Sequence, residues 1–137
     1  MIGIVIVTHG RLGDALIEAA ELILGDRPDS LEAVSINLRE NAANLRGKIA
    51  ESIKRVDRKK GVVILTDMFG GTPSNLSYSF LEEGSIEVIS GVNLPILVKA
   101  ANARKNMDLL KLAECLEAYG KKSISLASGI LKGNKRG

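Results

Sequence analysis

Short runs of apolar, largely β-branched residues alternate with amphipathic segments along most of this chain. Four of these runs are predicted strands, at residues 2–7, 31–38, 61–66 and 86–90. The segments that follow them carry apolar residues at helical spacing and are predicted helices, at residues 11–24, after Asn41, from Thr72-Pro73 onward, and at 94–104 and 108–120. A strand and a helix thus repeat four times in series.

Such a series forms a parallel sheet, because each helix carries the chain back across one face of the sheet. We therefore predict an α/β fold with a doubly wound, mainly parallel sheet in the flavodoxin-like strand order 2-1-3-4. Thr72 is expected to cap the helix that Pro73 enters, and Asn93 the helix at 94–104. Residues 123–127 alternate between polar and apolar residues and are predicted as a last strand.

The 137 residues make a single domain, with an α/β core at residues 1–122 and a C-terminal strand and basic tail at 123–137. The hydrophobic share of 45% and the charged share of 26% exclude intrinsic disorder. No apolar run approaches the roughly 18 residues of a membrane helix, and residues 2–7 lack the flanks of a signal peptide. The single cysteine, Cys115, fits a reducing compartment, so we expect a cytoplasmic location.

Aromatic residues are scarce, at 3% with no Trp, and the chain holds one His and one Cys. Single-stranded nucleic acid is bound by stacking on aromatic side chains, and metal centres of His and Cys need several such ligands. We therefore expect no metal, no cofactor and no nucleic-acid partner. The net charge of +3 lies largely in a basic stretch typical of a solubilising tail, at Lys121, Lys122, Lys132, Lys135 and Arg136.

The only histidine and an aspartate directly follow the first and third predicted strands, as His9 and Asp67. In a doubly wound fold, ligands bind beyond the carboxyl ends of the strands, where the strand order reverses. The order 2-1-3-4 places these two strands side by side at that point, about 4.8 Å apart. Asp67 would then accept the Nδ1 proton of His9 and leave Nε2 free as a nucleophile.

A glycine-rich stretch opens a helix across the same crevice. Gly70 and Gly71 allow close backbone approach, and Thr72 and Ser74 offer hydroxyls, so we predict a phosphate-binding loop made chiefly of backbone amides. An imidazole nucleophile, an orienting carboxylate and an anion-binding loop suit phosphoryl transfer through a phosphohistidine. Because the sequence has no Walker loop and no acidic metal cluster, the expected phosphate donor is a protein.

Three motifs resemble the IIA component of the mannose/fructose/sorbose family of the bacterial phosphoenolpyruvate-dependent sugar phosphotransferase system. They are IVIVTHG at residues 4–10, TDMFGGTPSN at 66–75 and SGVNLP at 90–95. The resemblance implies that His9 is phosphorylated at Nε2, with Asp67 as its hydrogen-bond partner. It also implies that phosphate comes from the carrier protein HPr and passes to a IIB protein.

The same resemblance implies a homodimer, in which the strand at 123–127 crosses to pair with the partner subunit. Such a dimer would account for the helix at 108–120, whose apolar residues cover more than one face. Since the 137 residues include no IIB domain, the acceptor is expected to be a separate protein, and contact with the membrane only indirect, through transporter components. The sugar stays unidentified, because a IIA component contacts proteins and phosphate.

Other functions compete with a transport role. A hydrolase triad could combine His9 and Asp67 with Thr72 or Ser74, but no G-x-S-x-G elbow occurs. A receiver-like module would need paired acidic residues after the first strand, which are missing. A regulatory, phosphorylatable IIA-like sensor without a transport role would use the same His9 and stays open as the alternative. Arg11 is expected as an exposed residue at a helix start, with its contact to HPr or phosphate left open.

Overall fold

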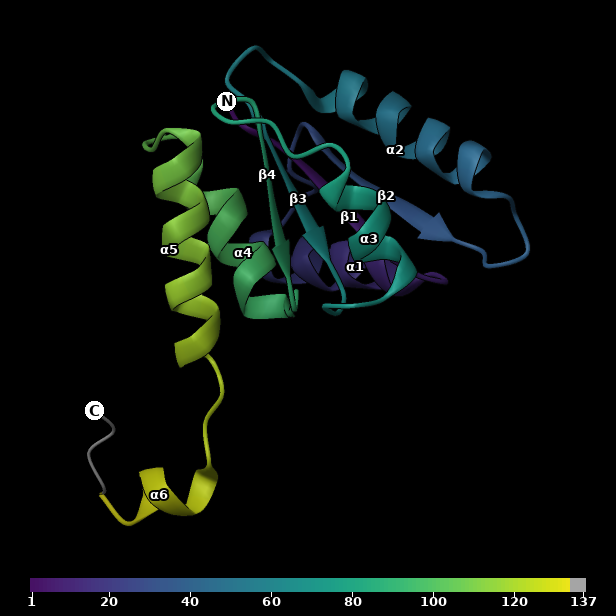
Figure 1. Ribbon diagram of the computed structural model, residues 1–137. Coiled ribbons are helices and arrows are strands. Elements are labelled where there is room, and N and C mark those ends of the chain that lie inside the picture. Colours follow the sequence, from purple (N-terminus) through teal and green to yellow (C-terminus); the bar gives the residue numbers. More distant parts are fainter. Residues whose placement is uncertain (134–137) are drawn as a thin grey trace.

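A four-stranded parallel sheet forms the centre of the protein. The computed structural model describes residues 1–133, and its strands lie in the order β2-β1-β3-β4, so the predicted order is confirmed. The strands are β1 Gly3–His9, β2 Leu31–Ile36, β3 Val62–Thr66 and β4 Ile86–Ser90. All neighbouring pairs are parallel, so the carboxyl ends of the strands meet at one edge of the sheet (Figure 1).

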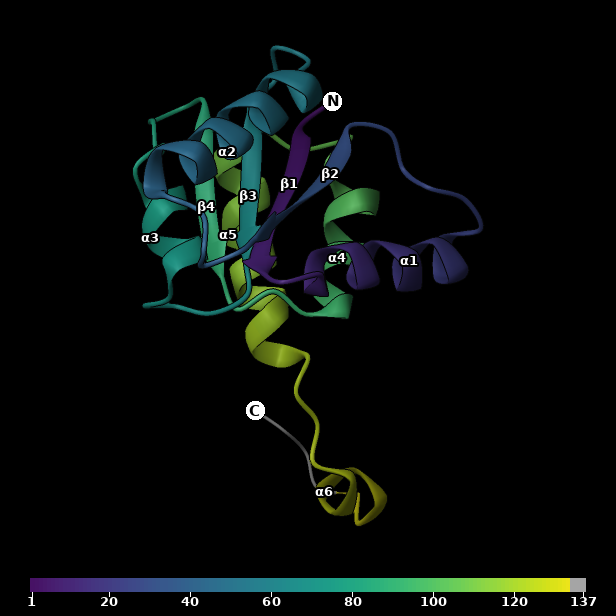
Figure 2. The ribbon, with the colours of Figure 1, turned by 90° about the vertical axis from the view of Figure 1, so that its right-hand side faces the viewer.

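Helices cover both faces of this sheet. Three lie on one face and two on the other: α1 Leu12–Leu24, α4 Leu94–Ala103 and α5 Leu109–Lys122, opposite α2 Ala42–Val56 and α3 Thr72–Tyr78 (Figures 1 and 2). In β1, Ile4 and Ile6 join the core beneath the first group, while Val5 and Val7 join the core beneath the second. Both faces of β1 are therefore buried, which explains its continuous apolar run.

Local signals account for several helix ends. Asn41, Asn93 and Asp108 each accept, through a side-chain oxygen, a hydrogen bond of 2.8–2.9 Å from the backbone N–H three residues further on. These bonds satisfy N–H groups that a helix start leaves unpaired. Gly25 ends α1 in the left-handed backbone region, at φ +95°, which glycine adopts without strain.

The start of α3 differs by one residue from the prediction. Gly71, rather than Thr72, is the N-cap, with an extended backbone at φ −90° and ψ 169°; Thr72 begins the helix. Proline has no N–H to lose and fits either of the first two positions of a helix. The Thr-Pro pair alone therefore does not decide which residue precedes the helix.

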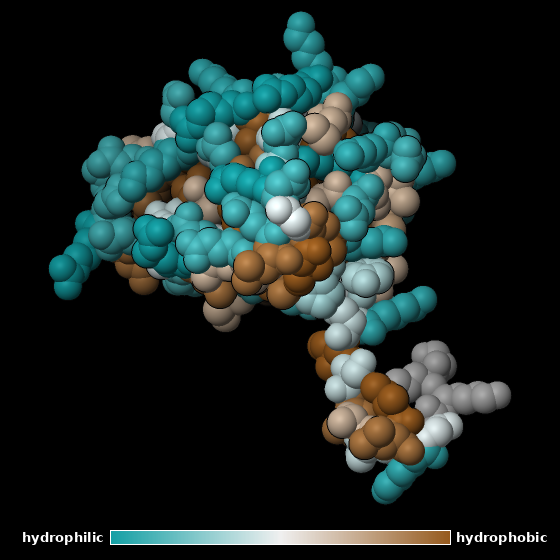
Figure 3. All heavy atoms as spheres, turned by 180° about the vertical axis from the view of Figure 1, so that it is seen from behind, coloured by the Kyte–Doolittle hydropathy of each residue, from teal (hydrophilic) through white to brown (hydrophobic). Residues whose placement is uncertain are grey.

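The predicted strand at residues 123–127 is wrong for the single chain. After α5, residues 124–126 lie outside the sheet, and Ala127 begins a short helix, α6 (Ala127–Leu131), that stands away from the body (Figure 1). Alternating apolar residues do not make a strand unless a neighbouring strand pairs with their backbone. Figure 3 shows apolar side chains gathered on this projecting segment, where the exposed large ones are Ile124, Leu126, Ile130 and Leu131.

The end of the predicted basic tail, with Lys135 and Arg136, lies outside the described residues. Among residues 1–133, no helix combines the length and the apolar character that a bilayer-spanning segment requires.

Candidate functional site

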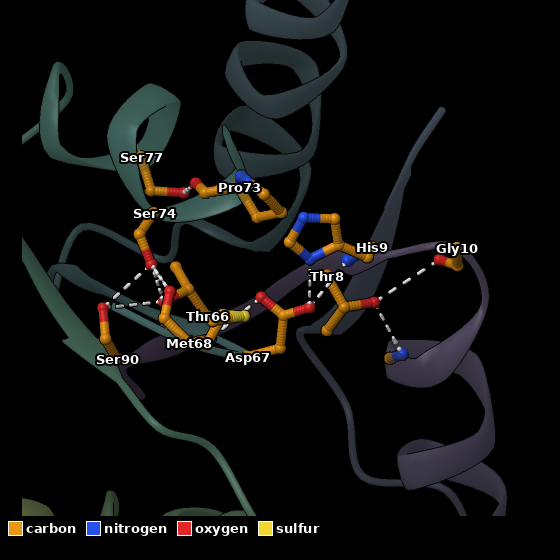
Figure 4. A network of polar contacts seen from close by, with 11 residues as sticks. Thr8, His9, Gly10, Thr66, Asp67, Met68, Pro73, Ser74, Ser77 and Ser90 are labelled. Carbon is orange, nitrogen blue, oxygen red and sulfur yellow. Dashed lines mark hydrogen bonds and ion pairs between the residues drawn. The ribbon is translucent and has the colours of Figure 1, made fainter. Parts of the chain in front are cut away.

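The carboxyl ends of β1 and β3 bring His9 and Asp67 together. β1 ends at His9, β3 ends at Thr66, and Val7 pairs with Thr66 in the parallel register, so Asp67 emerges beside the histidine. His9 Nδ1 lies 2.8 Å from Asp67 Oδ2 (Figure 4). The His9 backbone N–H donates to the same oxygen at 2.8 Å. The predicted contact between the two strand ends is thus present, although 58 residues separate its members in the sequence.

Both carboxylate oxygens of Asp67 are held. Oδ2 takes the two bonds from His9, and Oδ1 accepts the Met68 backbone N–H at 2.9 Å. Partial burial raises the pKa of the Asp67 carboxyl, but the His9 backbone bond, the ring contact and the Met68 N–H together outweigh burial and lower the pKa below its ordinary value. Asp67 is therefore a carboxylate at neutral pH, and its charge favours the tautomer with the proton on Nδ1.

The imidazole stays accessible on its other edge. The His9 side chain is 40% exposed, whereas the Asp67 side chain is only 10% exposed. In Figure 4 the Nδ1 edge faces Asp67, and the opposite edge of the ring, which carries Nε2, faces Pro73 at the start of α3. The His9 side chain is thus held at Nδ1 and remains partly open to solvent.

The glycine-rich loop packs closely against this ring. A side-chain carbon placed on Gly71 would lie 2.9 Å from His9 Cε1 and 3.5 Å from Nε2, so any larger residue here would require the ring or the loop to shift. Gly70 has φ +86°, in the backbone region that favours glycine. The first intrahelical bond of α3 runs from Asn75 N–H to Gly71 O at 2.9 Å, so the N–H groups of Thr72 and Ser74 precede it and have no intrahelical acceptor.

Comparisons with known proteins assign the chain to a family and agree with its fold. A family model described as "PTS system fructose IIA component", where PTS is the phosphotransferase system, matches residues 3–117. The chain belongs to this family. It is 33% identical over 129 residues to the fructose-specific EIIA component of Bacillus subtilis (strain 168), covering 93% of this chain and 88% of that protein.

Two further comparisons agree. Over 104 residues the chain is 38% identical to the mannose-specific EIIAB component of Escherichia coli (strain K12), covering 75% of this chain but 32% of that protein. This chain thus matches about a third of that longer relative. The crystal structure of a phosphotransferase system EIIA component from Streptococcus agalactiae superposes with a TM-score of 0.83 at 26% identity, covering 93% of this chain and 98% of that chain.

In this IIA chain, the Ser74 hydroxyl does not face the histidine. Ser74 is fully buried, and its Oγ donates to the Met68 carbonyl while lying 2.6 Å from Thr66 Oγ1 and 3.0 Å from Ser90 Oγ. Tyr78 adds its hydroxyl at 2.7 Å from Ser90 Oγ. Sequence reasoning missed this cluster of Thr66, Ser74, Tyr78 and Ser90, although a polar residue at the end of a buried strand is an available signal.

Thr8 is a second buried hydroxyl that sequence reasoning missed in this IIA chain. It is fully buried, and its Oγ1 accepts the Gly13 N–H at 2.9 Å and donates to Gly10 O at 3.4 Å. Gly10 has φ +52°, so the chain turns sharply between His9 and α1. Thr8 therefore ties the start of α1 to the end of β1 and holds the turn that presents the imidazole.

Apolar side chains close to His9 and Asp67 in the sequence of this IIA chain are exposed. They are Leu12, Met68 and Phe69, exposed by 48–78%. Arg11 is the residue before α1, 81% exposed as expected, with Asp14 Oδ2 3.7 Å from its guanidinium. Within residues 1–133, no three or more His, Cys, Asp or Glu side chains gather in a way that could hold a metal ion.

Proposed function

We propose that this IIA component carries a phosphoryl group on His9 Nε2, which it accepts from phosphorylated HPr and passes to a IIB protein. The observation that carries the proposal is the 2.8 Å contact between His9 Nδ1 and the Asp67 carboxylate. In the first transfer, the Nε2 lone pair forms a bond to phosphorus as the bond from phosphorus to the donor breaks. The electron pair of that bond goes to the donor. The second transfer repeats the exchange, with His9 as the leaving group.

Asp67 orients and stabilises rather than reacts. Its carboxylate keeps the proton on Nδ1, so the Nε2 lone pair points outward, and it offsets the positive charge that develops on the ring during transfer. Because the pKa of Asp67 is lowered, the carboxylate does not take up the proton itself at neutral pH. The ring is thereby returned to the same tautomer after each transfer.

The phosphoryl oxygens would be held by the loop that packs on the ring. Backbone N–H groups of Gly70, Gly71, Thr72 and Ser74 lie on this loop, and the short approach of Gly71 to His9 supports their contact with a group on Nε2. Phosphoryl transfer depends chiefly on positioning and on stabilisation of charge, so it suits a site with few reacting side chains. Thr72 adds a hydroxyl at the first position of α3.

We also propose that the protein is a homodimer in which residues 123–127 of each chain pair with β4 of the other. β4 is an edge strand of the sheet, and a cavity of about 590 Å³ runs beside it, lined in part by Ser90, Leu110 and Ile124. Leu110 and Ile124 are 58% and 78% exposed in the single chain. A second copy of the alternating segment would cover these apolar side chains and pair the open edge.

The function is tested by incubating the protein with phosphoenolpyruvate, enzyme I and HPr and measuring acid-labile protein-bound phosphate. We expect phosphate on the wild-type chain and none on His9→Ala. The proposal fails if the wild type is not labelled, or if His9→Ala is labelled equally. Addition of a IIB protein of the same family should then remove the label; retention of the label would favour a regulatory sensor over a transport role.

A further inference from the structure

Four hydroxyl groups from three elements meet beneath the loop that carries Asp67. Thr66 ends β3, Ser90 ends β4, and Ser74 and Tyr78 belong to α3. The oxygen–oxygen distances within the cluster are 2.6–3.0 Å. Figure 4 shows the side chains of Thr66, Ser74 and Ser90 directed toward one another. Ser74 connects the cluster to the loop, because its Oγ–H donates to the Met68 carbonyl.

The Met68 residue is thereby anchored at both of its backbone groups. Its N–H donates to Asp67 Oδ1 at 2.9 Å, and its carbonyl accepts from Ser74. The side chains of this stretch are largely exposed, Met68 by 56% and Phe69 by 78%, and Phe69 contacts the Tyr78 ring with centroids 6.2 Å apart. The position of the Met68 backbone, and with it the orientation of the Asp67 carboxylate, therefore depends on the hydrogen bond from Ser74.

Ser77 provides an internal comparison. It belongs to the same helix and is also fully buried, and its hydroxyl donates to Pro73 O at 2.7 Å, within the helix itself. Both serines thus contribute one buried hydroxyl to α3, but only Ser74 reaches the loop between β3 and α3. If both hydroxyls only stabilised the helix, removing either one would have the same effect on the His9–Asp67 pair.

We propose that Ser74 is a positioning residue for the His9–Asp67 pair, acting through the Met68 carbonyl to fix the carboxylate that sets the histidine tautomer. The predicted effect on the phosphorylation rate rests on the proposed phosphoryl transfer. The predicted effect on the His9 tautomer does not depend on any transfer. Ser74 then links two halves of the site, since its own backbone N–H lies on the loop proposed to hold the phosphoryl group.

The test compares Ser74→Ala with Ser77→Ala in the full chain. Nitrogen-15 NMR of the imidazole reports the tautomer at alkaline pH, and its signals are unambiguous because the chain holds one histidine. We expect a smaller fraction of the Nδ1–H tautomer in Ser74→Ala and the wild-type fraction in Ser77→Ala. The rate of phosphorylation by HPr should fall about fivefold in Ser74→Ala, the factor that one lost hydrogen bond gives, and stay within about twofold in Ser77→Ala.

Thr66→Val provides a second variant if Ser74→Ala does not fold. Valine has the same β-branched shape as threonine and lacks the hydroxyl that lies 2.6 Å from Ser74 Oγ, so the tautomer should shift in the same direction. The proposal is overturned if the tautomer and the relative rate are the same in Ser74→Ala, or in Thr66→Val in its place, as in Ser77→Ala. If the wild type takes up no phosphate but the tautomer still shifts in Ser74→Ala, the phosphoryl-transfer proposal fails while the positioning role stands.

Discussion

At the scale of single residues, the site consists of one imidazole whose two nitrogens have different surroundings. Nδ1 is directed to a carboxylate 2.8 Å away, while the ring is 40% exposed. Asp67 cannot be replaced by an amide without changing this arrangement, because an asparagine side chain can present either a donor or an acceptor to Nδ1. The carboxylate presents acceptors alone.

Asp67→Asn should fold and transfer phosphate more slowly. We expect a decrease of roughly ten- to a hundredfold in the rate of phosphorylation by HPr, since removal of an orienting partner has effects of this size. Phosphorylation reactions with labelled phosphoenolpyruvate, quenched at successive times, measure the rate, and circular dichroism checks the fold. An unchanged rate in a folded variant would contradict the orienting role.

The lowered pKa of Asp67 makes its contribution to stability depend on pH. A carboxyl with a lower pKa in the folded state stabilises the fold above its unfolded pKa, about 3.9, and this contribution is lost as the pH falls through the folded pKa. We therefore expect the difference in unfolding free energy between wild type and Asp67→Asn to shrink between pH 5 and pH 3. Urea unfolding at each pH measures it, and a constant difference would contradict the account.

Gly71→Ala should impair transfer through the histidine. The added methyl would lie 2.9 Å from His9 Cε1, so either the ring or the loop must move. We expect phosphorylation to slow by about tenfold or more, because misplacement of a reacting group by a fraction of an ångström has effects of this order. A wild-type rate in Gly71→Ala would show that the loop and the ring are not in close contact.

At the scale of helices and strands, the sheet was predictable because burial imposes a repeating pattern. The apolar run of β1 reflects burial on both faces, and the placement of His9 beside Asp67 followed from the meeting of parallel strand ends. Polar residues at the ends of buried strands were a signal for Thr66 and Ser90, but the direction of Ser74 Oγ was not predictable, since it depends on where β4 and α3 lie. The strand at 123–127 is absent from the single chain for a related reason, because a strand also needs a partner.

A substitution in α2 tests whether the stability of the fold can change while the rate of phosphorylation stays the same. Gly47 lies inside the helix with nothing within 4 Å of an added side-chain carbon. Gly47→Ala should raise the unfolding free energy by about 0.5–1 kcal/mol, because alanine loses less backbone entropy in a helix. The rate of phosphorylation should not change, which makes this variant the control for Gly71→Ala. A destabilised Gly47→Ala chain would contradict the packing described for α2.

At the scale of the whole molecule, the proposed exchange of the projecting C-terminal segment predicts a homodimer. Sedimentation of the wild type should give twice the chain mass of 14.6 kDa, and deletion of residues 123–137 should give a monomer. Ile124→Asp should also weaken the dimer, because Ile124 lines the cavity beside β4, while Ser125→Asp, one residue along, serves as the matched control. A wild-type monomer, or a dimer that survives the deletion, would contradict the strand exchange.

The proposed phosphorylation involves one atom of one residue, Nε2 of His9, and NMR can observe that atom. The phosphorylated protein, labelled with nitrogen-15 in its single histidine, can be studied by NMR for coupling between phosphorus and each ring nitrogen. We expect the coupling at Nε2 of His9 and a proton on Nδ1, which faces Asp67. Coupling at Nδ1, or phosphate on any other residue, would contradict the account.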